Sequence, residues 1–284
     1  MIFISTGGEP QFSAFETSRK FINAGITNIE LSGGQYSPNL LANLVSLKSI
    51  ANFQIHNYFP PPKEGFVFNL ASLDLSISSL SYKHAINAMQ WAIELGRPVY
   101  SFHAGFLLDP NIEELGKDVI SRPLFDREES IKSFIDQVNK LADYAHKLGM
   151  ELLIENNVLS ENNYLKFGCD PFLMTRASEF LRVMEETPQN VRLLVDLAHL
   201  KVSAKSLSFD PVLALKECDD YISAYHLSDN NGLHDSNDPV SNISWFWPYL
   251  KRGLSYYGLE VYRATMAELV KQYEMTAFLL GQVS

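Results

Sequence analysis

Ionisable side chains stand at the ends of six short, mostly apolar segments, which read QIH, SFH, LLIE, LLVD, AYH and GLE. A buried charge is costly unless it is paired or bound to a metal ion, so a converging set of such residues is informative. Carboxylates and imidazoles together suit a divalent ion such as Mn, Co, Zn or Mg. The residues are His56, His103, Glu155, Asp196, His226 and Glu260, with His199 three residues after Asp196.

These side chains can meet only if the fold places the six segments side by side. β-rich runs alternate with helical patterns along the chain, and the clearest helical pattern spans Glu129 to Leu148, with apolar residues at three- and four-residue steps. Gly149 follows it, as a helix C-cap does before the next strand. We expect eight strands, over Ile2–Ser5, Ile29–Ser32, Phe53–Asn57, Val99–His103, Glu151–Glu155, Arg192–Asp196, Ile222–His226 and Gly258–Val261.

Eight βα units favour a single α/β domain over residues 1–284, folded as a (β/α)8 TIM barrel. No Pro/Gly/Ser-rich linker or shift in composition divides the chain, which argues against a doubly wound sheet with a second domain. The C-terminal ends of barrel strands form the active site, so the six side chains should share one mouth. Two long connections, Pro60 to Ser81 and Leu159 to Thr175, are expected to act as lids over it.

The composition is that of a globular protein, with 284 residues, 46% of them hydrophobic and 20% charged. Its net charge of −10 disfavours nucleic acid as a partner. Two cysteines cannot form a disulfide framework, which indicates a reducing compartment. We find no basic leader and no apolar run of the ~18 residues that a membrane span needs, so we expect a cytoplasmic protein without a membrane partner. Homo-oligomerisation stays open.

The strings HNYFPPP, SFHAGF, LLIENN, LLVDLAHLKVS, YHLSDNNG and LEVY, in this order, resemble the xylose isomerase-like barrel superfamily, the group of sugar phosphate isomerases and epimerases. The similarity spans essentially the whole chain. In the ketose 3-epimerase branch, one divalent metal ion is held by a Glu, an Asp, a His and a second Glu from four successive strands. The resemblance implies that Glu155, Asp196, His226 and Glu260 hold such an ion here.

The resemblance also implies a sugar isomerase or epimerase that works by proton transfer. A metal ion on the carbonyl and adjacent hydroxyl oxygens stabilises the enediolate that forms when the α proton leaves. Glu155 and Glu260 are then the expected catalytic residues, one removing the proton and the other returning it. Return to the opposite face of the carbon gives epimerisation, and return to the neighbouring carbon gives isomerisation. The expected substrate-binding residues are His56, His103, His199 and Asp229, although Asp229 also suits a turn.

Three other functions stay open from the sequence alone. An inosose-type dehydratase would use the same metal and carboxylates and then lose a β-hydroxyl group. An endonuclease IV-like abasic-site nuclease would use three metals, but that branch has an Asp-x-His pair after strand seven, where this chain reads GLHDSN. A binding or scaffold barrel would not need the metal ligands. Whether a sugar substrate is phosphorylated is also open, since the loops near the mouth carry few cations beyond Lys63, Lys166 and Arg263.

Some prominent residues are not assigned to the site. Trp245 and Trp247 suit either an apolar wall for a sugar ring or packing between barrel and helix. His84 and His146 fall within helical patterns, away from the strand ends, and are expected at the surface.

Overall fold

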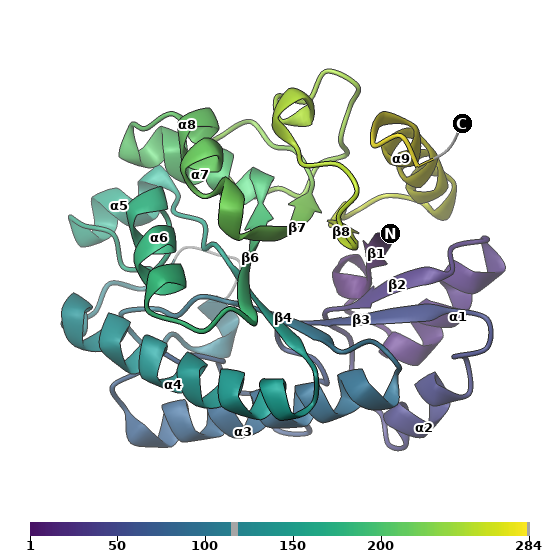
Figure 1. Cartoon of the computed structure of the whole chain (residues 1–284), viewed down its shortest axis with the longest axis horizontal. Helices are drawn as coiled ribbons and strands as arrows, with labels where there is room; N and C mark the ends of the chain where they lie inside the picture. Colours follow the sequence, from purple (N-terminus) through teal and green to yellow (C-terminus); the bar gives the residue numbers. More distant parts are fainter. Residues whose placement is uncertain (115–118, 283–284) are drawn as a thin grey trace.

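The computed structural model describes residues 1–114 and 119–282. Each strand pairs in parallel with the next, and β1 pairs with β8, so the sheet closes and the expected TIM barrel is confirmed. Figure 1 shows the helices around the outside of the strands. The strands are β1 (Ile2–Ser5), β2 (Asn28–Leu31), β3 (Asn52–His56), β4 (Val99–His103), β5 (Glu151–Glu155), β6 (Val191–Asp196), β7 (Ile222–Leu227) and β8 (Tyr256–Leu259).

Local signals define the helices. The side chain of Asp126 caps the first turn of α4 by accepting from the Glu129 N–H, and Gly149 follows that helix with a positive φ of 62°. Figure 1 shows α3 and α4 side by side. The described α-helices are α1 (Ala14–Asn23), α2 (Leu40–Val45), α3 (Leu75–Glu94), α4 (Arg127–Lys147), α5 (Glu161–Phe167), α6 (Ala177–Glu185), α7 (Leu197–Leu207), α8 (Pro211–Glu217) and α9 (Met266–Leu279). None of them is long and apolar enough to span a bilayer.

The two long connections differ from each other in their relation to the mouth of the barrel. The second, Leu159 to Thr175, contains α5 and contributes Ser160, Asn163 and Phe172 to a pocket at the mouth. In the first, α3 already begins at Leu75, and the Asn69 amide upstream of it donates to backbone carbonyls of the loop that follows β4. The first connection therefore supports a neighbouring loop. Since none of its residues is among those that line the pocket, the expectation of a lid there is wrong. The stretch from Ser228 to Ser255, which follows β7, contains no α-helix and is a long loop that the pattern missed.

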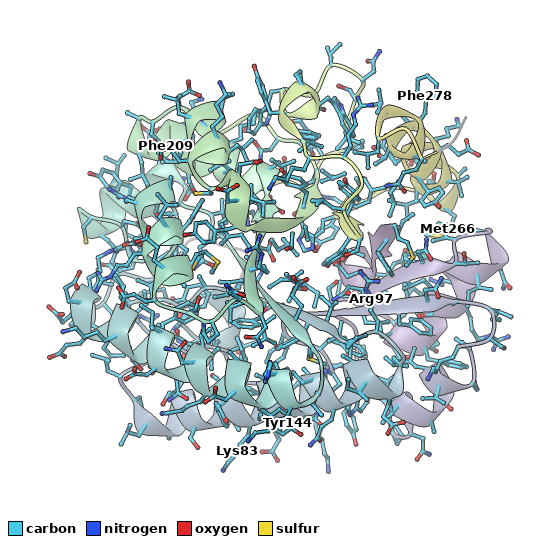
Figure 2. All side chains as sticks on the ribbon, in the orientation of Figure 1. Lys83, Arg97, Tyr144, Phe209, Met266 and Phe278 are labelled. Atoms are coloured by element: carbon cyan, nitrogen blue, oxygen red, sulfur yellow. The ribbon has the colours of Figure 1, made fainter. Side chains whose placement is uncertain are left out.

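An apolar layer closes the barrel below its mouth. The rings of Phe3 and Tyr256 meet edge to face, with centroids 5.6 Å apart, and the guanidinium of Arg97 lies over the Phe3 ring. Figure 2 shows Arg97 near the middle of the molecule, whereas Phe278 of α9 points outward and is 74% exposed. The polar groups at the strand ends therefore lie above this layer, on the side of the mouth. The layer consists of Phe3, Leu153, Leu194, Ala224 and Tyr256.

Candidate metal centre

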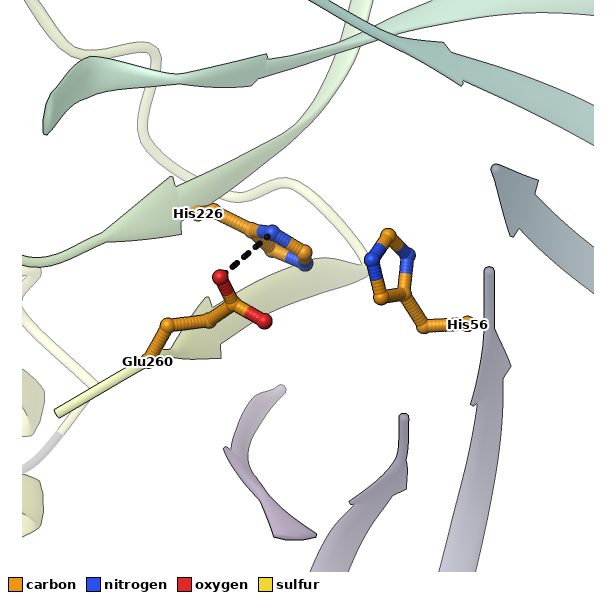
Figure 3. A group of neighbouring side chains, drawn as sticks. All are labelled: His56, His226 and Glu260. Atoms are coloured by element: carbon orange, nitrogen blue, oxygen red, sulfur yellow. Dashed lines mark ion pairs between the residues drawn. The ribbon is translucent and has the colours of Figure 1, made fainter. Parts of the chain in front are cut away.

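Four side chains from the last four strands meet at the C-terminal mouth of the barrel. Glu155 ends β5, Asp196 ends β6, His226 lies in β7 and Glu260 directly follows β8. Each offers one ligand atom, and these atoms all lie within 4.8 Å of one another. The Nδ1 atom of His226 is 3.2 Å from Glu155 Oε1 and 3.6 Å from Glu260 Oε2, the contact marked in Figure 3. All four side chains are buried.

This metal cluster, as we call these four residues, contains carboxylate oxygens without partners. Asp196 also caps α7, and its Oδ1 atom accepts the backbone N–H of His199 at 2.7 Å. Its Oδ2 atom and the Oε2 atom of Glu155 are buried and accept no hydrogen bond from the described residues. Such oxygens are unfavourable unless a cation binds them. Three carboxylates and one imidazole therefore fit a divalent metal ion.

Three histidines surround Glu155 at the edge of the metal cluster. His56 and His103 approach Glu155 Oε2 through their Nε2 atoms at 3.2 Å and 3.6 Å, outside hydrogen-bond geometry. The Nδ1 atom of His199 is 3.6 Å from Glu155 Oε1, and its Nε2 atom is 3.2 Å from Asp235 Oδ2. All three histidines line the pocket. Figure 3 shows that His56 and His226 reach the mouth from opposite sides.

The carboxylates of the metal cluster differ in their affinity for a proton. Burial raises the pKa of Asp196 to about 6 and the pKa of Glu260 well above its usual value. Burial acts in the same direction on Glu155, but the neighbouring His103 and His226 outweigh it and hold the pKa of Glu155 well below its usual value. Carboxyl groups with opposite pKa shifts in one cleft are typical of functional sites.

A pocket of about 740 Å³ opens above the metal cluster. One wall carries Phe106 and Phe172, from the loops after β4 and β5, whose rings meet edge to face. Asp235 and Asn237 come from the loop after β7. Arg263 is the only Lys or Arg among the described residues that line the pocket. The pocket thus joins a polar floor to a partly apolar wall, with little positive charge for binding an anion.

One residue expected to bind substrate lies apart from the others. Asp229 Oδ1 accepts from the Lys201 ammonium at 2.7 Å, and its Oδ2 accepts from the Ser244 hydroxyl at 2.7 Å. Its backbone also pairs with that of Asp238. The Asp229 side chain therefore stabilises the loop after β7. It does not lie at the metal cluster. The turn interpretation of Asp229 agrees with this geometry.

Sequence patterns missed Glu30 and Asp235. Glu30 lies in β2, is fully buried and contacts the Nε2 atom of His226 at 3.1 Å. It stands two residues before Ser32, so strand alternation could have placed it on the inner face of the barrel. Asp235 reaches His199 from the long loop after β7. No local signal fixes the position of a residue in such a loop.

The contacts of the two tryptophans favour one of the two open alternatives, and of the two helical histidines only His84 differs from expectation. Trp245 and Trp247 pack against the core, and the Trp247 indole N–H donates to the Ser241 carbonyl oxygen at 2.6 Å. Neither is among the described residues that line the pocket. His146 is exposed as expected, but His84 is only 7% exposed, so the surface expectation for His84 is wrong. His84 lies on the inner face of α3, where it stacks on Tyr58 with centroids 5.1 Å apart.

Comparison with solved structures shows the same barrel in several proteins. A D-tagatose 3-epimerase-like protein has a TM-score of 0.74 at 16% identity, covering 99% of this chain and 97% of its own. D-psicose 3-epimerase from Clostridium cellulolyticum H10, solved with D-tagatose, has a TM-score of 0.68 at 13% identity, covering 98% and 99%. A family 2 AP endonuclease from Brucella melitensis has a TM-score of 0.65 at 16% identity, covering 96% and 98%.

At these identities the structural likenesses establish the fold. No curated protein matches the sequence. Residues 20–255 match the family model described as "Xylose isomerase-like TIM barrel", which covers most of the barrel. The chain therefore belongs to the xylose isomerase-like TIM barrel family.

Proposed function

We propose that this protein is a divalent-metal-dependent isomerase or epimerase of a small sugar or polyol. The observation that supports this most strongly is the convergence of four ligand atoms within 4.8 Å, two of them on carboxylates with an unpartnered buried oxygen. Solved structures with the same barrel include epimerases of D-psicose and L-ribulose. The established family and the geometry of the mouth thus point to the same class of chemistry.

Glu155, Asp196, His226 and Glu260 would hold the ion. When bound, a divalent ion polarises a carbonyl group and stabilises negative charge on the substrate oxygens. Asp196 is well suited to a fixed ligand role, because its bond to the His199 N–H sets the direction of the carboxylate. His226 is held from both sides, by Glu155 at Nδ1 and by Glu30 at Nε2.

Glu155 and Glu260 would move the proton. They come from β5 and from the end of β8, so their carboxylates reach the ligand position from different strands. One carboxylate takes the proton from the carbon beside the carbonyl, and the other returns a proton. Return to the opposite face of that carbon inverts it, whereas return to the adjacent carbon exchanges ketose and aldose.

The remaining pocket residues would bind and orient the sugar. His56, His103 and His199 lie at the edge of the metal cluster, within reach of substrate hydroxyl groups. The shortage of Lys and Arg among the described lining residues favours an uncharged sugar over a sugar phosphate. The same shortage disfavours a DNA backbone, which proteins bind with many cationic contacts.

The proposal is tested by proton exchange. The metal-loaded protein is incubated in D2O with a panel of unphosphorylated ketoses, polyol ketones and their phosphates, and NMR follows deuterium at the carbons beside the carbonyl. We expect deuterium incorporation together with a new epimer or aldose, and only with the unphosphorylated compounds. An unsaturated product would assign the dehydratase reaction instead. No exchange with any compound, together with nicking of an abasic DNA duplex, would replace the proposal with the nuclease function.

A further inference from the structure

Glu30 is a buried carboxylate behind the metal cluster. It lies in β2, with no exposed surface, on the side of His226 that faces away from the other ligand atoms. Its Oε2 atom accepts from the Nε2–H of His226 at 3.1 Å. The Tyr256 hydroxyl donates to the same oxygen. A fully buried carboxylate is costly to keep, so these two donors from β7 and β8 are its main compensation.

Strand β8 is shaped to allow this contact. Gly258 faces the Glu30–His226 pair, and a Cβ atom at this position would lie 2.6 Å from Glu30 Oε2 and 2.6 Å from the His226 ring. Real Cβ atoms do not approach other atoms so closely. Because the Gly258 backbone does not have a positive φ, the glycine serves close packing here and not a turn. Residues of three strands, β2, β7 and β8, thus restrict the His226 ring to one orientation.

This arrangement decides which nitrogen of His226 faces the ligand position. A histidine binds a metal ion as neutral imidazole, which carries one N–H and one lone pair, so the ion would replace one of the two ring protons that the surrounding carboxylates now accept. If Nε2 donates to Glu30, the lone pair lies on Nδ1, and Nδ1 is the atom that points at Glu155 and Glu260. A carboxylate that takes the second N–H of a ligating histidine fixes its ring and raises its basicity.

We propose that Glu30 is a positioning residue, which orients His226 and keeps its Nδ1 atom available to the metal ion. The inference rests on the proposed function, because it requires that a metal ion binds the four-residue cluster. Two further residues hold Glu30 in this position. The Tyr256 hydroxyl donates to its carboxylate, and Gly258 has no side chain that would clash with it.

The test is metal affinity. Mn²⁺ is titrated calorimetrically into the metal-stripped full-length protein and its variants, and the visible spectrum of the Co²⁺-loaded proteins reports the ligand geometry. Glu30→Gln keeps the shape of the side chain and removes its charge, and it should weaken Mn²⁺ binding by about 10- to 100-fold and shift the Co²⁺ bands. Gly258→Ala keeps the Glu30 residue, but the added Cβ atom would displace its carboxylate and the His226 ring, so this variant should also lower the Mn²⁺ affinity.

Glu151→Gln is the matched control. Glu151 is a half-buried carboxylate at the opposite end of β5, near Ser223, and its substitution should leave the Mn²⁺ affinity unchanged. A folded Glu30→Gln protein with wild-type affinity and an unchanged Co²⁺ spectrum would overturn the role of Glu30 and leave the proposed function intact. If Glu30→Gln does not fold, wild-type affinity in Gly258→Ala would overturn that role in the same way. Wild-type protein that binds neither metal would overturn both proposals.

Discussion

Two buried histidines, His226 and His84, differ in their polar neighbours, although each lies beside a tyrosine ring. The nitrogens of His226 face the carboxylates of Glu155, Glu260 and Glu30. His84 is enclosed by the rings of Tyr58, Phe66 and Phe68, and its Nε2 atom finds no hydrogen-bond partner among the described residues.

The pKa values of the two histidines are also shifted in opposite directions. Burial lowers the pKa of both, but the carboxylates around His226 reverse the effect and raise its pKa well above the usual value. His84 has no such partner among the described residues, and burial lowers its pKa to about 4. Burial by itself therefore does not mark a ligand histidine. The acceptors that converge on the ring distinguish a candidate ligand from a core side chain.

The largest effect on the reaction rate should come from Glu155, whose carboxylate contacts His226 Nδ1. Glu155→Gln keeps the size of the side chain but removes the base and a metal ligand, so the proton-exchange rate should fall by about 10²- to 10⁴-fold. The rate is measured by deuterium incorporation at saturating Mn²⁺. Glu161→Gln, on the exposed first turn of α5, serves as the control. Exchange at the wild-type rate in Glu155→Gln would remove Glu155 from the reaction.

Removal of the metal ion from the cluster around His226 should lower the stability of the protein. A ligand that binds only the folded state at 100 times its dissociation constant stabilises it by about 2.7 kcal/mol. We expect chelation to lower the free energy of unfolding by about that amount, measured by urea denaturation with and without saturating Mn²⁺. Asp196→Asn should abolish most of the difference. Equal stability of the wild-type protein in both conditions would mean that the cluster holds no ion.

The aromatic environment of His84 should make the stability of the protein depend on pH. The pKa of folded His84 lies below the unfolded value, so the unfolded state binds the proton more readily. Stability is therefore present above about pH 6.5 and is lost as the pH falls toward 4. Between pH 7.5 and 5 His84 should contribute about 2 kcal/mol to the loss of stability, and His84→Phe should remove that contribution.

The control for this prediction is His146→Phe, at an exposed position on α4, which should leave the pH dependence as it is in the wild type. Urea denaturation at both pH values measures the free energy of unfolding for each protein. A His84→Phe protein with the full wild-type pH dependence would contradict the picture of a neutral histidine in an aromatic enclosure.

The smallest effect concerns a carboxylate outside both environments. Asp229→Asn weakens the partly exposed pair with Lys201, and it should cost about 0.2–1 kcal/mol of stability, with activity within about twofold of wild type. Denaturation and the exchange assay measure the two quantities. A tenfold loss of activity at unchanged stability would return Asp229 to the substrate site that the sequence pattern indicates for it.

The sequence was sufficient for the barrel and for the strand ends that converge at its mouth. The metal-ligand role of Glu155, Asp196, His226 and Glu260 came from the family resemblance and stays a prediction. Alternation along a strand and its exit into the mouth are local properties, and Glu155 and Asp196 end their strands as expected. The loop after β7 is different. Asp229 and Asp235 lie six residues apart, and only the tertiary structure shows that Asp229 pairs with Lys201 whereas Asp235 contacts His199.

Two other residues could have been found from periodicity. Glu30 lies on the inward face of a strand whose other residues are apolar or partly buried, but attention to strand ends alone passes over it. In α3 the buried positions Ser81, His84, Ala85 and Ala88 recur at three- and four-residue steps, which places His84 on the core face. What the sequence could not show is which rings enclose it, since these come from residues before the helix.

The most direct test of the central claim is an anomalous-difference map from a crystal of the protein soaked in Mn²⁺. We expect one strong peak at the mouth, coordinated by Glu155, Asp196, His226 through Nδ1, and Glu260. A fully soaked crystal with no peak at these four side chains would contradict the account.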